Sequence, residues 1–397
     1  MKKKILFIIP DLSAAGGEKS LVNLLQQIDY SKYSVDLFLI KINGLFLKYV
    51  PNEVNILDTP YNLNIFNKSV KKSVFKFLLE GKFSLAYSRI AFCIINRIMK
   101  NKGKAEQYSW KYLSKSINKI NKKYDVAIGF LEKQSNYLCI DNINAKTKIG
   151  WIHNDYYMLD LDKKFDKNYF EKFKYIVTVS DKCLDSLIKN FPEYEDKFKL
   201  IYNIISPKMI CKLAEEEVTD INFDSNYTNI VSIGRLSYQK SFELAIEAAK
   251  LIKEKGLKIK WLIIGEGEER ESLQKLIDDN ELSNEVKLIG LKDNPYKYVR
   301  RSDIYVQTSR FEGKAIAIDE AKSLCKPIIT TNYTTAKDQI NNEKNGLIVD
   351  MNSNSIADGI IRLINNENLK NKFIKNLLNE NIATEDEINK FYKLIIE

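Results

Sequence analysis

The sequence predicts an α/β fold with two doubly wound parallel sheets, one in each half of the chain. Three observations support this expectation. The chain has 397 residues, more than one typical hydrophobic core accommodates. Apolar runs of strand length alternate with segments of helical periodicity through both halves. The composition, with 45% hydrophobic and 29% charged residues, is that of an ordinary globular protein and gives no reason to expect disorder.

The first half contains six candidate strands. They are continuous apolar and β-branched runs, as expected for parallel strands that are buried on both faces. Their ranges are 4–10, 35–40, 125–130, 147–153, 175–180 and 199–205.

The second half repeats this organisation with six further candidate strands. Helical periodicity fills the gaps between them, and such alternation predicts parallel sheets with right-handed crossovers. The acidic, irregular stretch 206–228 is the expected link between the two halves. The ranges of the second set are 229–236, 260–266, 286–291, 303–309, 326–332 and 346–349.

The bulk properties exclude several classes of protein. The opening MKKKILFIIP resembles a signal peptide, but its short apolar run ends at Pro10 without a cleavage site, which favours a buried strand. The most apolar long run, 83–99, is broken by Arg89 and Arg97, so we expect no membrane span. The cysteines form no C-x-x-C pair, which indicates reduced cytoplasmic thiols and no structural zinc site. They are Cys93, Cys139, Cys183, Cys211 and Cys325.

The net charge of +10 is concentrated in residues 61–123, which hold 15 Lys and Arg against two acids. The rest of the chain has 47 bases and 50 acids. Apolar residues are interleaved with these bases, a pattern that predicts a basic amphipathic helix or helix pair for an anionic membrane surface. The alternative is a core helix with a solvated basic face. Without a recognised binding motif, the charge does not indicate nucleic acid.

Unusual residues gather at the predicted strand ends, where open parallel sheets bind their ligands. With two lobes that face each other, we therefore expect an active site in an interdomain cleft. After the first strand, Gly16 and Gly17 open a helix, where backbone donors can approach a ligand. A plain loop-to-helix turn explains this pair equally well.

Two cations follow the first strand of the second half, in GRLSYQK. Arg235 offers a planar fork and Lys240 a point charge near the start of the next helix, a combination that suits a diphosphate. The alternative is two solvated bases. The following IIGEGEER places Gly265 and Gly267 at another strand end, where we expect a wall of a nucleotide pocket.

A pair of carboxylates marks the stretch SRFEGKAIAIDEA. If a helix begins near Lys314, Glu312 lies in the loop before it and Glu320 about two turns inside. Eight helical residues rotate by only about 80° and advance by about 12 Å, so both carboxylates can face one elongated ligand, such as a ribose and a hexose joined by a diphosphate. The backbone N–H groups of Ala315 and Ile316 would meet that ligand between them.

These motifs resemble the retaining GT-B glycosyltransferases with the E-x7-E signature, the family 4-like enzymes of capsule and lipopolysaccharide assembly. The resemblance covers most of residues 229–350, from GRLSYQK through SRFEG to KPIITTNY and NGLIVD. In the first half, AAGGEK is similar to the family's G-G-x-E-K turn, with Ala15 in place of its first glycine.

The resemblance implies a role for each residue. Arg235 and Lys240, with Gly16, Gly17, Ala315 and Ile316, would bind the donor diphosphate, and Glu320 the ribose. Glu312 and His153, the only histidine, would contact the transferred sugar, although a lone histidine is usually structural. Gly265, Gly267 and Leu291 would line the nucleotide pocket. No metal or other cofactor is implied, and the D-x-D pattern of Asp160 and Asp162 lacks the strand context of a manganese site.

The resemblance also implies the domain organisation. It predicts an acceptor-binding Rossmann-like domain over 1–205, a nucleotide-sugar-binding one over 206–375, and a C-terminal helix over 376–397 that crosses back to the first domain. The predicted function is transfer of a hexose or N-acetylhexosamine, with retention, from a UDP-sugar to a lipid-diphosphate-linked glycan at the inner face of the plasma membrane. The alternatives are a soluble sugar or sugar-phosphate acceptor, or a non-catalytic partner subunit.

Overall fold

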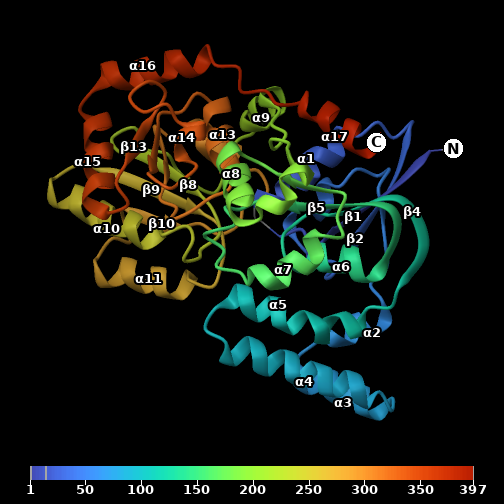
Figure 1. The fold of residues 1–397 in the computed structure, drawn as a ribbon. Helices are drawn as coiled ribbons and strands as arrows, with labels where there is room; N and C mark the ends of the chain where they lie inside the picture. Colours follow the sequence, from blue (N-terminus) through green and yellow to red (C-terminus); the bar gives the residue numbers. More distant parts are fainter. Residues whose placement is uncertain (1, 14–15, 397) are drawn as a thin grey trace. The chain divides into compact units, whose positions relative to one another are not determined.

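The computed structural model describes residues 2–13 and 16–396 (Figure 1). The chain divides into two compact units, of which the first holds residues 17–202 together with both ends of the chain. The second holds residues 203–386 together with Gly16. Each unit is built on a parallel sheet with helices, which confirms the predicted fold class of two doubly wound α/β domains.

The sheet of the first unit has seven strands in the order β3-β2-β1-β4-β5-β6-β7. All six expected strands are present. The seventh, β3, was not predicted because it pairs only through Asn55 and Ile56, on the outer edge of β2. The bounds are β1 Lys3–Ile9, β2 Tyr33–Leu39, β3 Asn55–Ile56, β4 Ile120–Gly129, β5 Ile143–Ile152, β6 Tyr175–Thr178 and β7 Phe198–Leu200.

Helices cover this sheet and fill the basic segment. The expected helix pair within 61–123 is a run of four helices, α2 to α5, between β3 and β4. Of the helices that the structure describes, none is long and apolar enough to cross a membrane. The bounds are α1 Gly16–Gln26, α2 Tyr61–Phe66, α3 Val70–Leu79, α4 Phe83–Ile98, α5 Lys102–Leu113, α6 Gln134–Asn142, α7 Lys163–Phe170 and α8 Asp181–Asn190, with short 3-10 turns at Leu45–Tyr49, Ser114–Ser116 and Pro192–Lys197.

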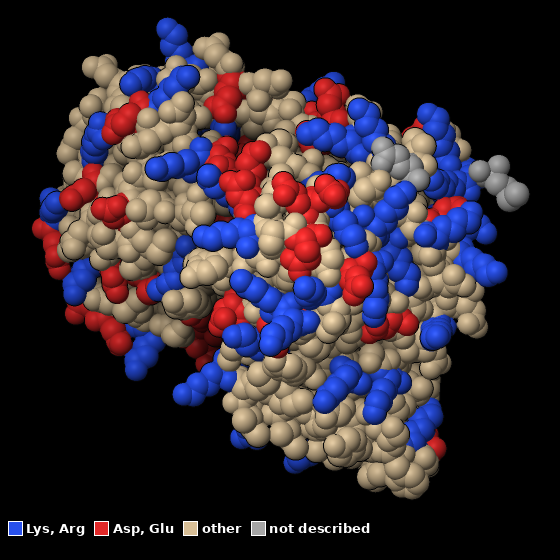
Figure 2. All heavy atoms as spheres, in the orientation of Figure 1, with Lys and Arg blue, Asp and Glu red and all other residues tan. Residues whose placement is uncertain are grey.

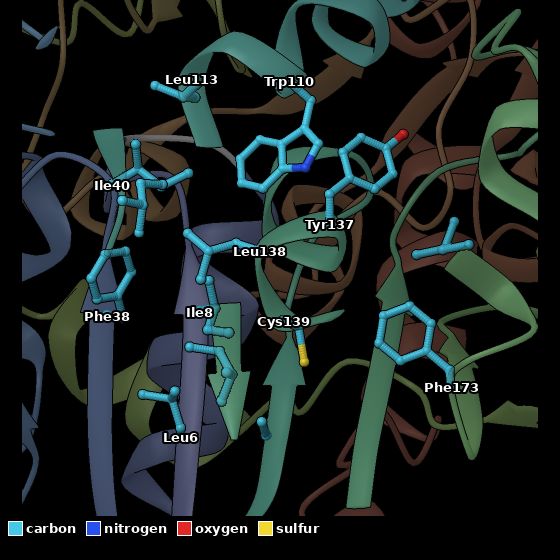
Figure 3. Close-up of a cluster of buried hydrophobic side chains, with 14 of the residues drawn as sticks. Leu6, Ile8, Phe38, Ile40, Trp110, Leu113, Tyr137, Leu138, Cys139 and Phe173 are labelled. Atoms are coloured by element: carbon cyan, nitrogen blue, oxygen red, sulfur yellow. The ribbon is translucent and has the colours of Figure 1, made fainter. Parts of the chain in front are cut away.

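The core of the first unit lies between the sheet and helices α5 and α6. Figure 3 shows Leu6 and Ile8 of β1 beneath this layer, with Trp110 of α5 and Tyr137 of α6 turned toward each other. The two rings are fully buried, with their centroids 6.0 Å apart. Because α6 packs on β1, β4 and β5, this core fixes the loops that leave the carboxyl ends of those strands.

The second sheet has six strands in the order β10-β9-β8-β11-β12-β13. Neighbouring residues of one strand belong to different cores, as the alternation of a strand that is buried on both faces requires. Ile230 packs with α10 and α15, whereas Val231 packs with α12 and α13. The strands are β8 Thr228–Ile233, β9 Ile259–Ile264, β10 Val286–Leu288, β11 Ile304–Gln307, β12 Ile328–Thr331 and β13 Leu347–Val349.

The helices of the second unit lie on both faces of its sheet. The predicted link 206–228 is not wholly irregular, because its first part forms α9, which packs through Ile210 and Ala214 against Tyr296 and Ile316. Pro207 at the first helical position favours this start. The bounds are α9 Pro207–Ala214, α10 Phe242–Glu254, α11 Arg270–Asp279, α12 Tyr296–Arg301, α13 Ile316–Ser323, α14 Ala336–Gln339, α15 Ser353–Ile364 and α16 Glu367–Leu378.

The last helix, α17 (Glu387–Ile396), is part of the first unit. The ring of Phe391 stacks on Phe7 of β1 with centroids 5.9 Å apart. The Tyr392 hydroxyl accepts a hydrogen bond from the Asp29 backbone N–H at 2.8 Å. Residues 376–397 are not one helix, since α16 ends at Leu378 and α17 begins nine positions further on, after a connecting segment.

Candidate active site

Both sheets have a topological switch point, where ligands of doubly wound folds bind. In the second sheet this point lies between β8 and β11, which are adjacent in space although β9 and β10 separate them in sequence. In the first sheet it lies between β1 and β4. The loops that follow these strands carry most of the candidate residues.

In the second unit, the loops after β8 and β11 meet through an ion pair. The Lys240 ammonium donates to Glu312 Oε1 at 2.5 Å, and both side chains are largely buried. The loops are further joined by the Gln239 carbonyl, which accepts from the Arg310 N–H at 2.8 Å. The structure therefore brings together the predicted phosphate-binding lysine and the predicted sugar-contacting carboxylate.

Several further donors surround the Glu312 carboxylate. The Ser309 hydroxyl donates to Oε1 at 2.6 Å, and the Gln239 side chain donates to Oε2 at 3.3 Å. The Gln307 amide is 3.4 Å from Oε1. Together with Lys240, these donors hold the Glu312 carboxylate in one orientation.

Arg235 is exposed on the turn directly after β8. It follows Gly234, where a Cβ would stand 3.1 Å from the Lys240 side chain. The loop after β9 lies against that turn because two of its residues are glycines. A Cβ on Gly265 would stand 1.8 Å from the Gly234 carbonyl oxygen, and one on Gly267 2.2 Å from that of Leu236. Any larger residue would push the two loops apart. These glycines thus shape the predicted nucleotide wall.

Leu291 extends this wall from a third loop, after β10. The residue before it, Gly290, accepts a hydrogen bond from the Gly265 N–H at 3.0 Å. The Leu291 side chain is 43% exposed. Leu291 was predicted to line the nucleotide pocket, and the structure places it as an exposed apolar residue next to a glycine turn.

Glu320 lies deeper than the sequence suggested. The helix α13 begins at Ile316, two residues after the expected start, so Glu320 is only its fifth residue and Glu312 is outside any helix. The helical rotation that we used to relate the two carboxylates therefore does not apply. Glu320 is almost fully buried, and the Tyr296 hydroxyl donates to its Oε1 at 2.8 Å.

The start of α13 is held by Gln339 of α14. The Ala315 N–H donates to Gln339 Oε1 at 2.9 Å, and Gln339 Nε2 donates back to the Ala315 carbonyl at the same distance. Ala315 directly precedes Ile316, the first residue of α13, and its side chain does not cap the helix. In this structure the Ala315 N–H, which was predicted to meet a phosphate, is thus engaged by a protein side chain.

In the first unit, His153 follows the last residue of β5 and is buried between aromatic rings. Its ring centroid is 5.0 Å from that of Phe130 and 6.2 Å from that of Trp151. The backbone of this strand end is fixed by Glu132, in the loop after β4. Glu132 accepts the His153 N–H at 3.0 Å and the Asn154 side-chain amide at 2.6 Å.

Burial in this aromatic site lowers the pKa of His153 from 6.5 to about 4, although the Glu132 charge acts to raise it. The ring is therefore neutral near pH 7. Its Nε2 atom is buried and has no hydrogen-bond partner among the residues that the structure describes. A buried polar atom without a partner is uncommon in folded proteins and is suited to accept a hydrogen bond from a ligand hydroxyl.

The glycine turn after β1 is described in part. Helix α1 begins at Gly16, and Gly17 lies close to the loop after β4, since a Cβ there would stand 2.6 Å from Leu131 Cδ2. Ala15, which stands in place of the family's first glycine, lies outside the described residues. Close packing against Leu131 is a structural reason for glycine at position 17.

Both carboxylates of the D-x-D pattern accept hydrogen bonds from the protein itself. Asp162 caps α7 by accepting the Lys164 N–H at 2.9 Å, and Asp160 accepts from Asn101 and Lys104. Within residues 2–13 and 16–396, no group of three or more His, Cys, Asp or Glu side chains is placed to hold a metal ion.

Sequence reasoning missed several residues of these sites. Glu132 carried a usable signal, because it is an acidic residue two positions after a predicted strand end. Ser309 and Gln239 also flank predicted strand ends. Tyr296 and Gln339 carried no such signal, because their contacts with Glu320 and Ala315 depend on how α12 and α14 pack against α13.

Two Rossmann-like units with these strand orders define the GT-B fold, and comparisons with known proteins agree. Residues 214–379 match the family model described as Glycosyl transferases group 1. This range includes the candidate site of the second unit, with Arg235, Lys240, Glu312 and Glu320. The match supports a GT-B glycosyltransferase.

Two relatives of this chain are named as glycosyltransferases. The N-acetylgalactosamine-N,N'-diacetylbacillosaminyl-diphospho-undecaprenol 4-alpha-N-acetylgalactosaminyltransferase of Campylobacter jejuni is 29% identical over 202 residues, 50% of this chain and 53% of the relative. The poly(glycerol-phosphate) alpha-glucosyltransferase of Bacillus subtilis is 26% identical over 340 residues, 83% of this chain and 47% of the relative. The chain thus spans about half the length of these relatives.

Solved structures share the whole fold. A mutant of TarM from S. aureus, in complex with Fondaparinux, alpha-GlcNAc-glycerol and UDP, aligns over 100% of both chains with a TM-score of 0.67 and 16% identity. HepE of Anabaena in complex with UDP-glucose aligns over 99% of both chains with a TM-score of 0.68, also at 16% identity. At this identity the likeness shows the fold alone.

Proposed function

We propose that the protein is a retaining glycosyltransferase that moves a hexose or N-acetylhexosamine from a UDP-sugar to a lipid-diphosphate-linked oligosaccharide during cell-surface polysaccharide synthesis. The observation that carries the proposal is the Lys240–Glu312 ion pair on adjoining loops at the switch point of the second sheet, with Arg235 exposed on the turn after β8. Cations and an oriented carboxylate at this position suit the two ends of a sugar diphosphate.

In this proposal, Arg235 and Lys240 stabilise the charge that develops on the departing nucleoside diphosphate. Preorganised cations are effective there because they need no rearrangement as the charge forms. Lys240 is already held by Glu312, so it is positioned before the donor arrives. The two cations take the place of a metal, and the reaction is proposed to need none.

Glu320 is proposed to bind the ribose, because a carboxylate accepts hydrogen bonds from two vicinal hydroxyls. The Tyr296 hydroxyl donates a hydrogen bond to Oε1 and so fixes the orientation of the Glu320 carboxylate. Gly265, Gly267 and Leu291 line the base end of the site. The UDP in the solved structures of TarM and HepE supports a uridine nucleotide as the donor.

Two further residues are assigned to the transferred sugar. Glu312 accepts its hydroxyls from the second unit. His153, whose Nε2 is an acceptor without a partner among the described residues, accepts a hydroxyl from the first. Retention of configuration can follow same-face attack or a covalent intermediate. The donors around Glu312 favour same-face attack, because hydrogen bonds weaken a carboxylate as a nucleophile. Three of the four contact Oε1, so Oε2 can still accept a sugar hydroxyl.

The acceptor and location are proposed from chemistry and from relatives. The name of the Campylobacter relative includes the term diphospho-undecaprenol, which is a lipid diphosphate. The positive charge of residues 61–123 suits the anionic inner face of the plasma membrane, where such acceptors lie.

The test is a panel of nucleotide-sugars offered with a lipid-linked acceptor and with a soluble sugar acceptor. We expect one UDP-sugar to be turned over only with the lipid-linked acceptor, and the product to keep the anomeric configuration of the donor. Inverted configuration, or activity that is unaffected by Glu312→Ala and Arg235→Ala, would refute the proposal.

A further inference from the structure

Helices α3 and α4 expose an unusual number of large apolar side chains. Of the 18 large hydrophobic side chains that are exposed among the described residues, eight lie on these two helices. We call these eight the α3–α4 apolar face: Phe75, Leu78, Leu79, Phe83, Tyr87, Ile90, Ile94 and Ile98. Contiguous exposed apolar surface of this kind usually marks a docking site.

Helical geometry aligns the α4 members of this face. Phe83, Tyr87, Ile90, Ile94 and Ile98 are spaced by three or four residues, so they form one stripe along a helix about 24 Å long. The opposite side of α4 holds it to the unit. There Ala86 and Ser88 are buried, and Phe92 makes an edge contact with Phe66 at 5.4 Å. The helix is thus apolar on both sides. On the exposed side, Tyr87 makes an edge contact with Tyr112 of α5 at 6.2 Å, and all five members of the stripe remain exposed.

The charges around this face restrict what can cover it. Residues 61–123 carry 15 bases against Glu80 and Glu106. Salt bridges neutralise the charge of both acids. Glu80 pairs with Lys76 at 3.2 Å and with Lys82 at 2.7 Å. Glu106 pairs with Lys133. Figure 2 shows Lys and Arg among uncharged side chains on the lower part of the view, where Figure 1 places α3 to α5, with little acidic surface.

We propose that the α3–α4 apolar face inserts into an anionic lipid surface and that its flanking bases bind the headgroups. A partner that covers this face must offer both apolar groups and negative charge. A lipid surface offers both, as acyl chains and as anionic headgroups. A second copy of this face would bring one basic surface against another. This inference deepens the membrane part of the proposed function, because it assigns binding to apolar insertion by α3 and α4 rather than to charge alone.

The test measures co-sedimentation of the full chain with vesicles. The wild type is expected to bind vesicles of equimolar phosphatidylglycerol and phosphatidylcholine, and to bind phosphatidylcholine alone weakly. The double variant Ile94→Glu, Ile98→Glu is expected to lose at least about tenfold in partition at both low and high salt. The matched control Leu378→Glu changes an exposed leucine of α16 and is expected to bind as the wild type does.

A second pair of variants separates charge from insertion. Lys71→Gln with Lys72→Gln is expected to weaken partition at low salt by about 25-fold, because each base contributes a factor of about five. Its control, Lys250→Gln with Lys287→Gln, removes two exposed bases from the second unit and is expected to have no effect. Wild-type binding by the α4 double variant would overturn the proposal. The proposal would also be overturned if the wild type did not bind vesicles but formed a dimer, and the α4 double variant were monomeric.

These outcomes can be told apart from a failure of the proposed transferase function. The α4 double variant changes only exposed side chains, so its stabilisation by UDP is expected to match that of the wild type. If the wild type binds vesicles but no UDP-sugar stabilises it, the transferase proposal alone fails. If UDP-sugars bind and vesicles do not, the lipid inference alone fails.

Discussion

The strand ends of the two sheets follow the same topology but present opposite chemistry. At the switch point of the second sheet, a lysine and a carboxylate form an ion pair with further hydrogen bonds. Beside the switch point of the first sheet, a neutral histidine lies between Phe130 and Trp151, and the nearby carboxylate Glu132 is used to hold the backbone. One position is arranged for charge and the other for a neutral hydrogen bond.

In the proposed function, this difference divides the recognition of a sugar nucleotide between a charged strand end and a neutral one. A diphosphate needs cations that are fixed before it binds, and a sugar needs acceptors in an apolar setting. The rigid sheets place both kinds of group at strand ends. The loops then determine which kind each unit presents.

The largest expected effect is that of Lys240→Met. It removes the cation proposed to stabilise the leaving diphosphate, so we expect kcat to fall by about 100- to 1,000-fold. It also leaves Glu312 buried without its ion-pair partner, which should lower the free energy of unfolding by roughly 3 kcal/mol. Steady-state kinetics and urea unfolding measure the two effects.

The double variant Lys240→Met, Glu312→Gln separates stability from activity. Replacing the carboxylate by an amide removes the unpaired charge, so most of the lost unfolding free energy should return while activity stays low. If activity recovered together with stability, Lys240 would have only a structural role.

The second effect concerns the single histidine. Because the folded-state pKa of His153 is about 4 and the unfolded value is near 6.5, the unfolded chain takes up a proton first as the pH falls. The stability contributed by the neutral ring is therefore fully present above about pH 6.5 and is lost as the pH falls toward 4, by roughly 3 kcal/mol. His153→Phe should remove this part of the pH dependence. The imidazole NMR signal, unambiguous in a chain with one histidine, should titrate near pH 4.

A smaller effect is expected from Glu132→Gln. The glutamine keeps an acceptor for the His153 N–H but removes the negative charge that raises the histidine pKa. We therefore expect the NMR titration of His153 to move to lower pH and KM for the sugar donor to rise several-fold, with a modest change in kcat. Glu132→Asp keeps the charge on a shorter side chain and serves as the comparison. An unchanged titration in Glu132→Gln would show that its carboxylate does not influence the ring.

The smallest effect is expected from Ser309→Ala. It removes one of four donors to Glu312, whereas Lys240, Gln239 and Gln307 remain. One hydrogen bond to a charged group contributes about 1.5–3 kcal/mol at most, and the remaining donors can compensate in part. We expect kcat/KM to fall by about three- to tenfold. A loss as large as that of Lys240→Met would mean that the serine, and not the cation, sets the position of the carboxylate.

The residues show why the fold was easier to predict than the site. Runs such as ILFII and WLII are apolar throughout, so parallel strands and their carboxyl ends followed from the pattern alone. Strand β3 was missed because two residues carry no pattern, and the start of α13 was placed two residues early. The Lys240–Glu312 contact joins residues 72 positions apart, so it depends on loop packing that the glycines at 265 and 267 shape. Glu132 could have been found by asking which polar residues follow each strand.

The central claim is that the loops after β8 and β11 bind the diphosphate of a uridine nucleotide. The most direct measurement compares the stabilisation by UDP and by uridine in the wild type and in the double variant Lys240→Met, Glu312→Gln. We predict that UDP at 100 times its Kd adds about 2.7 kcal/mol to the unfolding free energy of the wild type, that uridine at the same concentration adds much less, and that the double variant loses this difference. If the double variant still prefers UDP over uridine as strongly as the wild type does, the account is contradicted.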